Sequence, residues 1–120
     1  TNDLCQYLFA ADRMNPDLSA YCQPFAPAFL RVLRSVISAF ETAGKEVSMC
    51  GELAGDPRAT ALLIGLGLKK FSMNASAVPA VKMALSKTGA AQAKSLAAEA
   101  AELATQADVT GLLTRHGLWV

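Results

Sequence analysis

Cys50 is the residue whose type and setting first point to chemistry. It ends the short apolar run KEVSMC (45–50), which we predict as a strand, and it is followed by Gly51 and by the helix-start pair Asp56 and Pro57. Parallel α/β folds bind ligands at the carboxyl ends of their strands, close to helix N-termini that favour anions. A thiol placed there can act as a general acid. Judged by position alone, however, a cysteine at the end of a strand is more often a small apolar residue without a chemical role. Both interpretations of Cys50, structural and catalytic, therefore stay open.

Two further segments also place small or polar side chains where a loop leads into a helix. FSMNAS (71–76) places small and amide side chains between a predicted strand and a helix, and TNDL (1–4) is a candidate third loop of this kind. We therefore expect three loop starts to share one site on one face of a barrel. Glu52 is either a second carboxylate of that site or a residue that makes backbone contacts before the next helix.

The elements that position these loops follow from periodicity and from start and stop signals. We predict strands at 45–50 and 69–73 and a short helix or loop at 3–11. Helices are expected at about 28–43, from 57 to 65 or 67, from about 76 to a break at 88–89, at 90–104 and at 106–115. Thr105 and Asp108 form a capping-box pattern before the last helix. Gly44 is expected to end the helix predicted at about 28–43 by adopting a left-handed backbone conformation.

Short strands that alternate with helices indicate parallel βα units and an α/β, helix-dominated fold. Two strands cannot close a barrel or make a stable open sheet. We therefore expect the chain to be a piece of a larger domain, with apolar helix faces that lack partners. Their apolar residues are Phe29, Leu33, Val36 and Phe40 on one helix, and Leu62, Leu63 and Ile64 on another.

Composition narrows the class of protein. The 120 residues are 52% hydrophobic and 18% charged, with a formal net charge of +1. The balanced charge argues against nucleic-acid or membrane-surface binding, and no apolar run is long enough for a membrane span. The three cysteines match no zinc or disulfide framework, so free thiols in a reducing cytoplasm are expected. The single histidine, His116, lies near a helix end, where we expect a structural role.

Three segments, in this order and spacing, resemble a known family. TNDLCQYLFAADR (1–13), SMCGELAGDP (48–57) and GLGLKKFSM (65–73) are similar to enzyme I, the phosphoenolpyruvate–protein phosphotransferase of the bacterial phosphotransferase system. Nitrogen-related enzyme I and the multiphosphoryl transfer proteins share these motifs. The resemblance implies that residues 1–120 are part of the phosphoenolpyruvate-binding domain. They would form the C-terminal third of a TIM (β/α)8 barrel, with strands 7 and 8, helices 6 to 8 and the closing helices.

The resemblance also implies an activity and a set of roles. The family transfers phosphoryl from phosphoenolpyruvate to an enzyme histidine and releases pyruvate, in sugar or nitrogen-related phosphotransferase systems. Cys50 would protonate the enolate carbon, Asn2 and Arg13 would bind substrate, and Asp3 would bind Mg²⁺ as cofactor. The implied partners are an upstream histidine-bearing domain, the histidine phosphocarrier protein and a second copy in a homodimer formed through the barrel.

Departures from the family pattern affect the substrate loop. Where the family commonly has Asp-Pro-Leu-His-Pro, this chain has QPFAP (23–27), and Met14 replaces the usual glycine after Arg13. The chain also lacks the family's metal-ligand glutamate and further arginines, so we expect it to be inactive by itself. The alternatives are a non-catalytic helical interaction or dimerisation module, or another phosphoenolpyruvate-utilising enzyme such as pyruvate phosphate dikinase.

Overall fold

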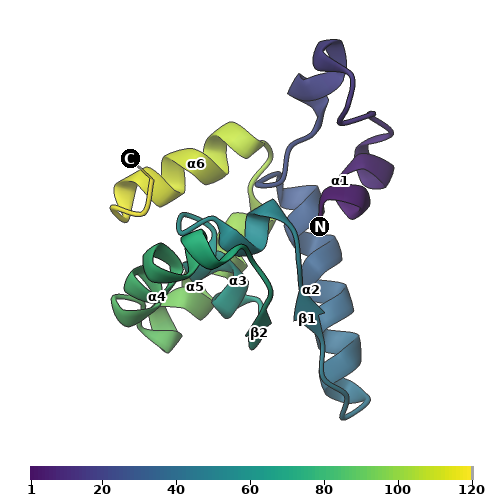
Figure 1. The fold of residues 1–120 in the computed structure, drawn as a ribbon. Helices are drawn as coiled ribbons and strands as arrows, with labels where there is room; N and C mark the ends of the chain where they lie inside the picture. Colours follow the sequence, from purple (N-terminus) through teal and green to yellow (C-terminus); the bar gives the residue numbers. More distant parts are fainter. Residues whose placement is uncertain (120) are drawn as a thin grey trace.

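A computed structural model of the chain describes residues 1–119. Helices dominate, and two short strands lie among them (Figure 1). In chain order the elements are α1 (Asn2–Phe9), η1 (Pro16–Tyr21), α2 (Pro27–Thr42), β1 (Ser48–Met49), η2 (Glu52–Gly55), α3 (Thr60–Gly65), β2 (Lys70–Phe71), η3 (Ala75–Ala77), α4 (Val78–Ser86), α5 (Ala90–Glu102) and α6 (Gln106–Arg115). No helix in this part of the chain is both long and apolar enough to cross a membrane.

The two strands pair in parallel, as predicted. Ser48 lies opposite Lys70 and Met49 opposite Phe71. The backbone N–H of Ser72 extends the ladder by donating to the Met49 carbonyl oxygen at 2.8 Å. Both strands are shorter than predicted, but their order and the crossover through α3 confirm a βαβ unit within the described residues.

Helix α2 shows how far periodicity alone determines packing. Phe29, Leu33 and Ile37, spaced four residues apart, are buried on one face, so the expectation that Phe29 and Leu33 would lack partners within the chain is wrong. Val36 and Phe40 extend the same apolar stripe but remain 40% and 38% exposed. The helix ends close to Gly44, whose φ of +64° matches the predicted left-handed stop.

Helix α3 packs closely against α5, and this contact forms the centre of the core. Leu62 and Leu63 are each 1% exposed, so the expectation that α3 would lack a partner within the chain is wrong. Gly65 allows the close approach, because a Cβ at this position would overlap the Ala93 carbonyl group and lie 2.7 Å from the Ala97 Cβ. The small residues of the alanine-rich helix therefore serve to bring the two backbones together.

The predicted start of α3 needs a correction. Asp56 does not cap this helix, since residues 57–59 form a turn and the helix begins at Thr60. The Asp56 carboxylate instead accepts hydrogen bonds from the Arg58 backbone N–H at 2.9 Å and from its guanidinium group at 2.7 Å. The Asp56 carboxylate thus closes the turn that precedes α3 and pairs with Arg58, and does not cap the first turn of the helix itself.

The last helix begins with a capping box, and the segment that follows it packs against Phe25 and the turn after η2. Its capping box is confirmed, with the Asp108 N–H donating to Thr105 Oγ1 at 3.1 Å. Beyond it, Trp119 packs edge-on against Phe25, with 4.8 Å between ring centroids. The Arg58 guanidinium carbon lies 4.2 Å from the Trp119 ring centroid. These contacts join the regions around residues 25, 58 and 119.

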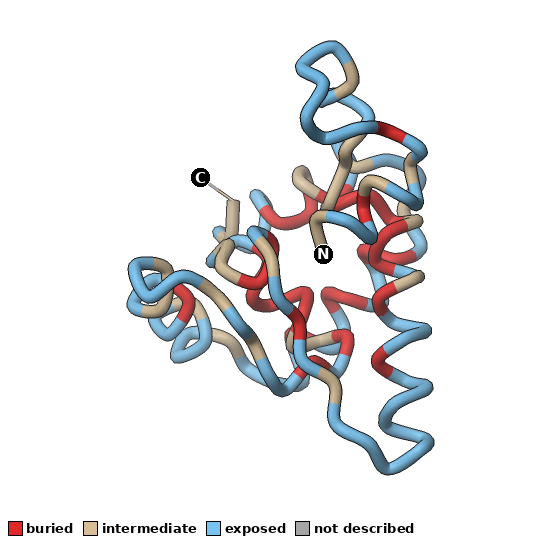
Figure 2. Tube along the Cα trace, turned by 45° about the vertical axis from the view of Figure 1, so that its right-hand side comes forward, coloured by how far each residue is buried: buried red, intermediate tan, exposed pale blue. Residues whose placement is uncertain are grey.

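Burial is concentrated where α2, α3 and α5 pack against one another. The segment between α1 and α2 projects from this body and is mostly exposed (Figures 1 and 2). It contains Met14, which is 80% exposed. The loop that follows the TNDL motif is therefore supported by few contacts within the described chain.

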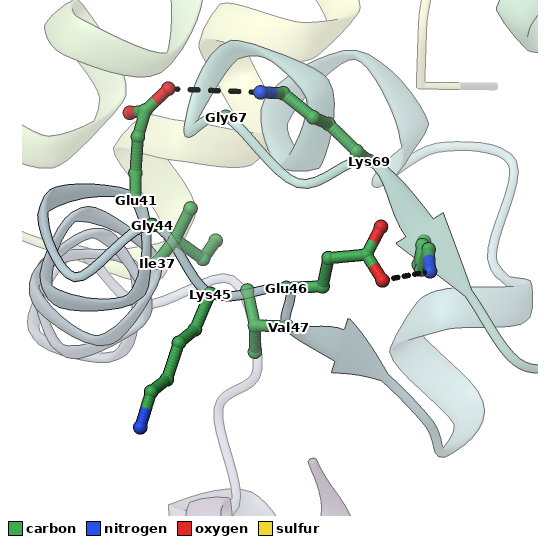
Figure 3. A pocket seen from close by; sticks show the side chains of 9 residues that line it. Ile37, Glu41, Gly44, Lys45, Glu46, Val47, Gly67 and Lys69 are labelled. Carbon is green, nitrogen blue, oxygen red and sulfur yellow. Dashed lines mark hydrogen bonds and ion pairs between the residues drawn. The ribbon is translucent and has the colours of Figure 1, made fainter.

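A cavity of about 260 Å³ lies at the amino ends of the two strands (Figure 3). Two ion pairs cross it, Glu46–Lys70 at 2.6 Å and Glu41–Lys69 at 3.7 Å, while the Lys45 side chain points away from both. The hydrogen bond from Lys70, aided by its charge, lowers the pKa of Glu46. These pairs connect the approach to β1 with β2 and with the end of α2.

Candidate active site

Three loop starts meet at the carboxyl ends of the strands. Asn2 at the start of α1, residues 50–52 after β1 and residues 72–74 after β2 line one open cavity of about 570 Å³. This is the grouping expected from the sequence, because neighbouring parallel strands present their carboxyl ends on the same edge. Polar side chains from all three motifs therefore lie at one site, at the other end of the strands from the cavity of Figure 3, although Asp3 does not line this site.

The first two loops are joined through the Cys50 carbonyl group. The Thr1 backbone nitrogen and the Thr1 hydroxyl both donate to this oxygen, each at 2.9 Å. The Ser72 backbone N–H donates to the carbonyl oxygen of Met49, the residue before Cys50. The segment around residue 50 therefore lies between Thr1 on one side and Ser72 on the other. Sequence reasoning did not assign Thr1, and its only signal was its place before the Asn-Asp pair.

A second link joins Asn2 to Glu52. The Glu52 backbone N–H donates to Asn2 Oδ1 at 3.3 Å, and Asn2 Nδ2 donates to Glu52 Oε1 at 3.4 Å. Both residues are at loop starts, but nothing in their separate patterns predicts that they pair. The sequence left open a second carboxylate or a backbone contact for Glu52, and the structure shows its backbone and its carboxylate both engaged with one amide.

Gly51 makes the approach of these two loops possible. Its φ is +105°, a conformation that side-chain-bearing residues rarely adopt. A Cβ here would lie 2.5 Å from Thr1 Oγ1 and 3.1 Å from Asn2 Oδ1. The glycine is therefore required both by its backbone conformation and by its two neighbours.

The three cysteines differ in their surroundings. All are free, as predicted, and Cys50 is exposed at the mouth of the cavity. Cys5 is buried, and burial, with a smaller contribution from nearby Cys22, raises the pKa of its thiol. The Cys22 thiol faces the Ala11 carbonyl oxygen at 3.5 Å. Cys5 and Cys22 line a neighbouring cavity with Asn2 and Glu52, whereas Cys50 is exposed and lines the cavity shared by the three loop starts.

Arg13 and Asp3 form an ion pair with 3.1 Å between guanidinium nitrogen and carboxylate oxygen. Their side chains are 42% and 77% exposed, so the pair is weakly held and accessible. Arg13 lines a second cavity of about 310 Å³, which also contains Asn2 and Glu52. Asn2 and Glu52 therefore form the wall shared by the cavity with Arg13 and the cavity with Cys50.

The donor set for a metal is small. Among residues 1–119, no group of three or more histidine, cysteine or acidic side chains is placed to hold a metal ion. Mg²⁺ suits a sparse site of this kind, since it is commonly held by one or two carboxylates together with substrate oxygens and water. The exposed Asp3 carboxylate has the right chemistry for one such ligand.

Comparisons with known proteins identify the family to which the chain is similar. A family model described as "PEP-utilising enzyme, PEP-binding domain" matches residues 1–90. A phosphoenolpyruvate-protein phosphotransferase of Buchnera aphidicola (subsp. Acyrthosiphon pisum) is 44% identical over 113 residues, covering 94% of this chain and 20% of the relative. The corresponding enzyme of Staphylococcus carnosus is 41% identical over 116 residues, covering 97% and 20%. Multiphosphoryl transfer protein 1 of Escherichia coli K12 is 40% identical over 114 residues, covering 95% and 14%. The chain thus spans a fifth or less of the length of these relatives.

Proposed function

The chain belongs to the family of PEP-utilising enzymes and matches their PEP-binding domain, and from this premise we propose an activity for the protein that contains it. That protein transfers a phosphoryl group from phosphoenolpyruvate to a histidine of the same enzyme and releases pyruvate, in a sugar or nitrogen-related phosphotransferase system. The observation that carries the proposal is the convergence of three loop starts, with Cys50 exposed among them, on one cavity.

The proposal includes the architecture around the site. The family implies a TIM-barrel portion, and the parallel pairing of β1 with β2 is consistent with neighbouring barrel strands. The Thr1–Cys50 hydrogen bonds join the start of α1 to the end of β1. We propose that residues 1–120 form part of the phosphoenolpyruvate-binding barrel domain. The remaining partners are the upstream histidine-bearing domain, the histidine phosphocarrier protein and a second copy in a cytoplasmic homodimer.

The negative charges of phosphoenolpyruvate give roles to Arg13 and Asp3. Phosphoenolpyruvate carries a phosphate and a carboxylate, which a guanidinium group can bind through two parallel hydrogen bonds. In the proposed complex Arg13 leaves Asp3 and binds substrate, while Asp3 becomes available to hold Mg²⁺. When bound, Mg²⁺ supplies positive charge beside the phosphoryl oxygens. The weak, exposed Arg13–Asp3 pair is suited to this exchange, because little is lost when it opens.

Cys50 completes the reaction. Loss of the phosphoryl group leaves enolpyruvate, whose methylene carbon must gain a proton to become the methyl group of pyruvate. The Cys50 S–H bond breaks, its proton goes to that carbon and the electrons of the bond remain on sulfur as a thiolate. Because Cys50 is exposed, solvent can return the proton to the thiolate. Asn2, in the same cavity, orients the phosphoryl end of the substrate.

The test is a Cys50→Ala substitution in the full-length protein. Loss of a general acid typically costs about 100-fold or more in rate, so pyruvate release should slow by at least that factor. The KM for phosphoenolpyruvate should change much less, since the thiol is not proposed to bind the phosphate. Ser48→Ala, at an exposed position of β1 that lines neither the cavity with Arg13 nor the cavity with Cys50, is the control and should leave pyruvate release near the wild-type rate. Steady-state rates within twofold of wild type for Cys50→Ala would overturn the proposal.

A further inference from the structure

Glu52 and Asn2 hold one another through both ends of the Asn2 amide. The amide oxygen accepts from the Glu52 backbone N–H at 3.3 Å, and the amide nitrogen donates to the Glu52 carboxylate at 3.4 Å. An ionised carboxylate can only accept and a backbone N–H can only donate. The pair therefore determines which end of the amide carries the oxygen and which carries the nitrogen.

The Asn2 amide lies in the wall shared by the two cavities. Asn2 and Glu52 line both the cavity that contains Arg13 and the cavity that contains Cys50. Arg13 belongs only to the first and Cys50 only to the second. A substrate with its phosphate toward Arg13 and its methylene carbon toward Cys50 would pass over the amide. The orientation of Asn2 therefore affects how the two ends of the substrate are aligned.

Charge argues against direct contact between Glu52 and the substrate. Both ends of phosphoenolpyruvate are anionic, so a carboxylate that touched them would repel them. The second N–H of the Asn2 amide, by contrast, is a neutral donor suited to a phosphoryl oxygen. Glu52, although it lines both cavities, can thus promote binding by fixing this donor, and not by touching the substrate itself.

We propose that Glu52 is a positioning residue, which acts through the Asn2 amide to orient phosphoenolpyruvate between Arg13 and Cys50. The inference rests on the proposed function and extends it to a residue that does not itself touch substrate. Gly51 supports the same contact, since its lack of a side chain allows residue 52 to approach Asn2.

The test compares Glu52→Ala, Glu52→Gln, Asn2→Ala and the double variant Asn2→Ala/Glu52→Ala in the full-length protein. Glu52→Ala should raise the KM for phosphoenolpyruvate by about tenfold, the effect of losing one hydrogen bond near a charged group. Glu52→Gln keeps an acceptor oxygen and should recover most of that loss. The double variant should have a KM close to that of Asn2→Ala, because Glu52 acts only through the amide. Glu46→Gln, at the opposite end of the strands, is the control and should leave KM unchanged.

The outcomes separate this inference from the proposed function. If Asn2→Ala raises KM and Glu52→Ala does not, Glu52 has no positioning role while the proposed function stands. If the two losses add in the double variant, or if Glu52→Gln is as impaired as Glu52→Ala, the carboxylate acts independently of the amide and the inference is overturned. If Asn2→Ala leaves KM unchanged, Asn2 does not bind substrate and the inference falls with that assignment. The Cys50→Ala experiment still tests the reaction itself.

Discussion

Gly51→Ala offers the most direct test of how the two loops are joined. The added methyl group would lie 2.5 Å from Thr1 Oγ1, which is 0.9 Å short of an ordinary 3.4 Å contact. It would also lie 3.1 Å from the Thr1 nitrogen and from Asn2 Oδ1, and the backbone would have to keep a φ of +105°. The substitution therefore opposes the native loop geometry both by steric overlap and by backbone strain.

The magnitude follows from comparing this strain with the bonds that resist it. A residue forced into a glycine-only conformation costs about 1–3 kcal/mol, and overpacking adds about 1–3 kcal/mol. The hydrogen bonds that hold the two loops together, from Thr1 to Cys50 and between Asn2 and Glu52, contribute about 1 kcal/mol each and are exposed to solvent. Because the strain is of the same size as these bonds or larger, we expect the loops to separate by somewhat less than 1 Å. A displacement on this scale can lower kcat by about 100-fold.

The assay is steady-state pyruvate release by the full-length protein, with urea unfolding measured on the same samples. Gly44→Ala is the matched control. Gly44 also has a positive φ, +64°, but no atom lies within 4 Å of the added carbon. It should cost about 1 kcal/mol of stability from the left-handed conformation and leave kcat unchanged. Wild-type kcat in Gly51→Ala, or an equal loss of kcat in both variants, would refute the reasoning.

Three further predictions follow from other contacts. Gly65→Ala should lower the unfolding free energy by about 3 kcal/mol or more in urea titrations, because the methyl group overlaps the Ala93 carbonyl; a change below 1 kcal/mol would mean that α3 and α5 can separate freely. Glu46→Gln should flatten the acid limb of stability against pH, because the lowered pKa of Glu46 gives stabilisation present above the ordinary glutamate value of 4.5 and lost as pH falls through the lowered pKa. Identical acid limbs would show that the bond to Lys70 contributes nothing. Asp3→Asn should raise the Mg²⁺ concentration needed for half-maximal pyruvate release by about tenfold or more, since a neutral oxygen replaces a charged ligand; an unchanged requirement would remove Asp3 from the metal site.

Local interactions explain what the sequence alone could predict. The buried positions at Phe29, Leu33 and Ile37, and the capping box at Thr105 and Asp108, depend on residues three or four apart in one helix. The strand–helix–strand order also follows from local patterns, and it implies that loop starts gather at one edge. Motif order was sufficient for the family, which the match over residues 1–90 confirms.

Only the tertiary structure decided which of these parts touch. Asn2 meets Glu52 across 50 positions of the chain, and α5 covers α3 because Gly65 allows their backbones to meet. Asp56 bonds to Arg58, and the helix that it was predicted to cap begins only at Thr60. Periodicity and capping rules describe one segment at a time, whereas these outcomes depend on the distance and direction between side chains that folding brings together. The sequence by itself thus determined the elements and the family, and the packing of those elements decided the partners of each site residue.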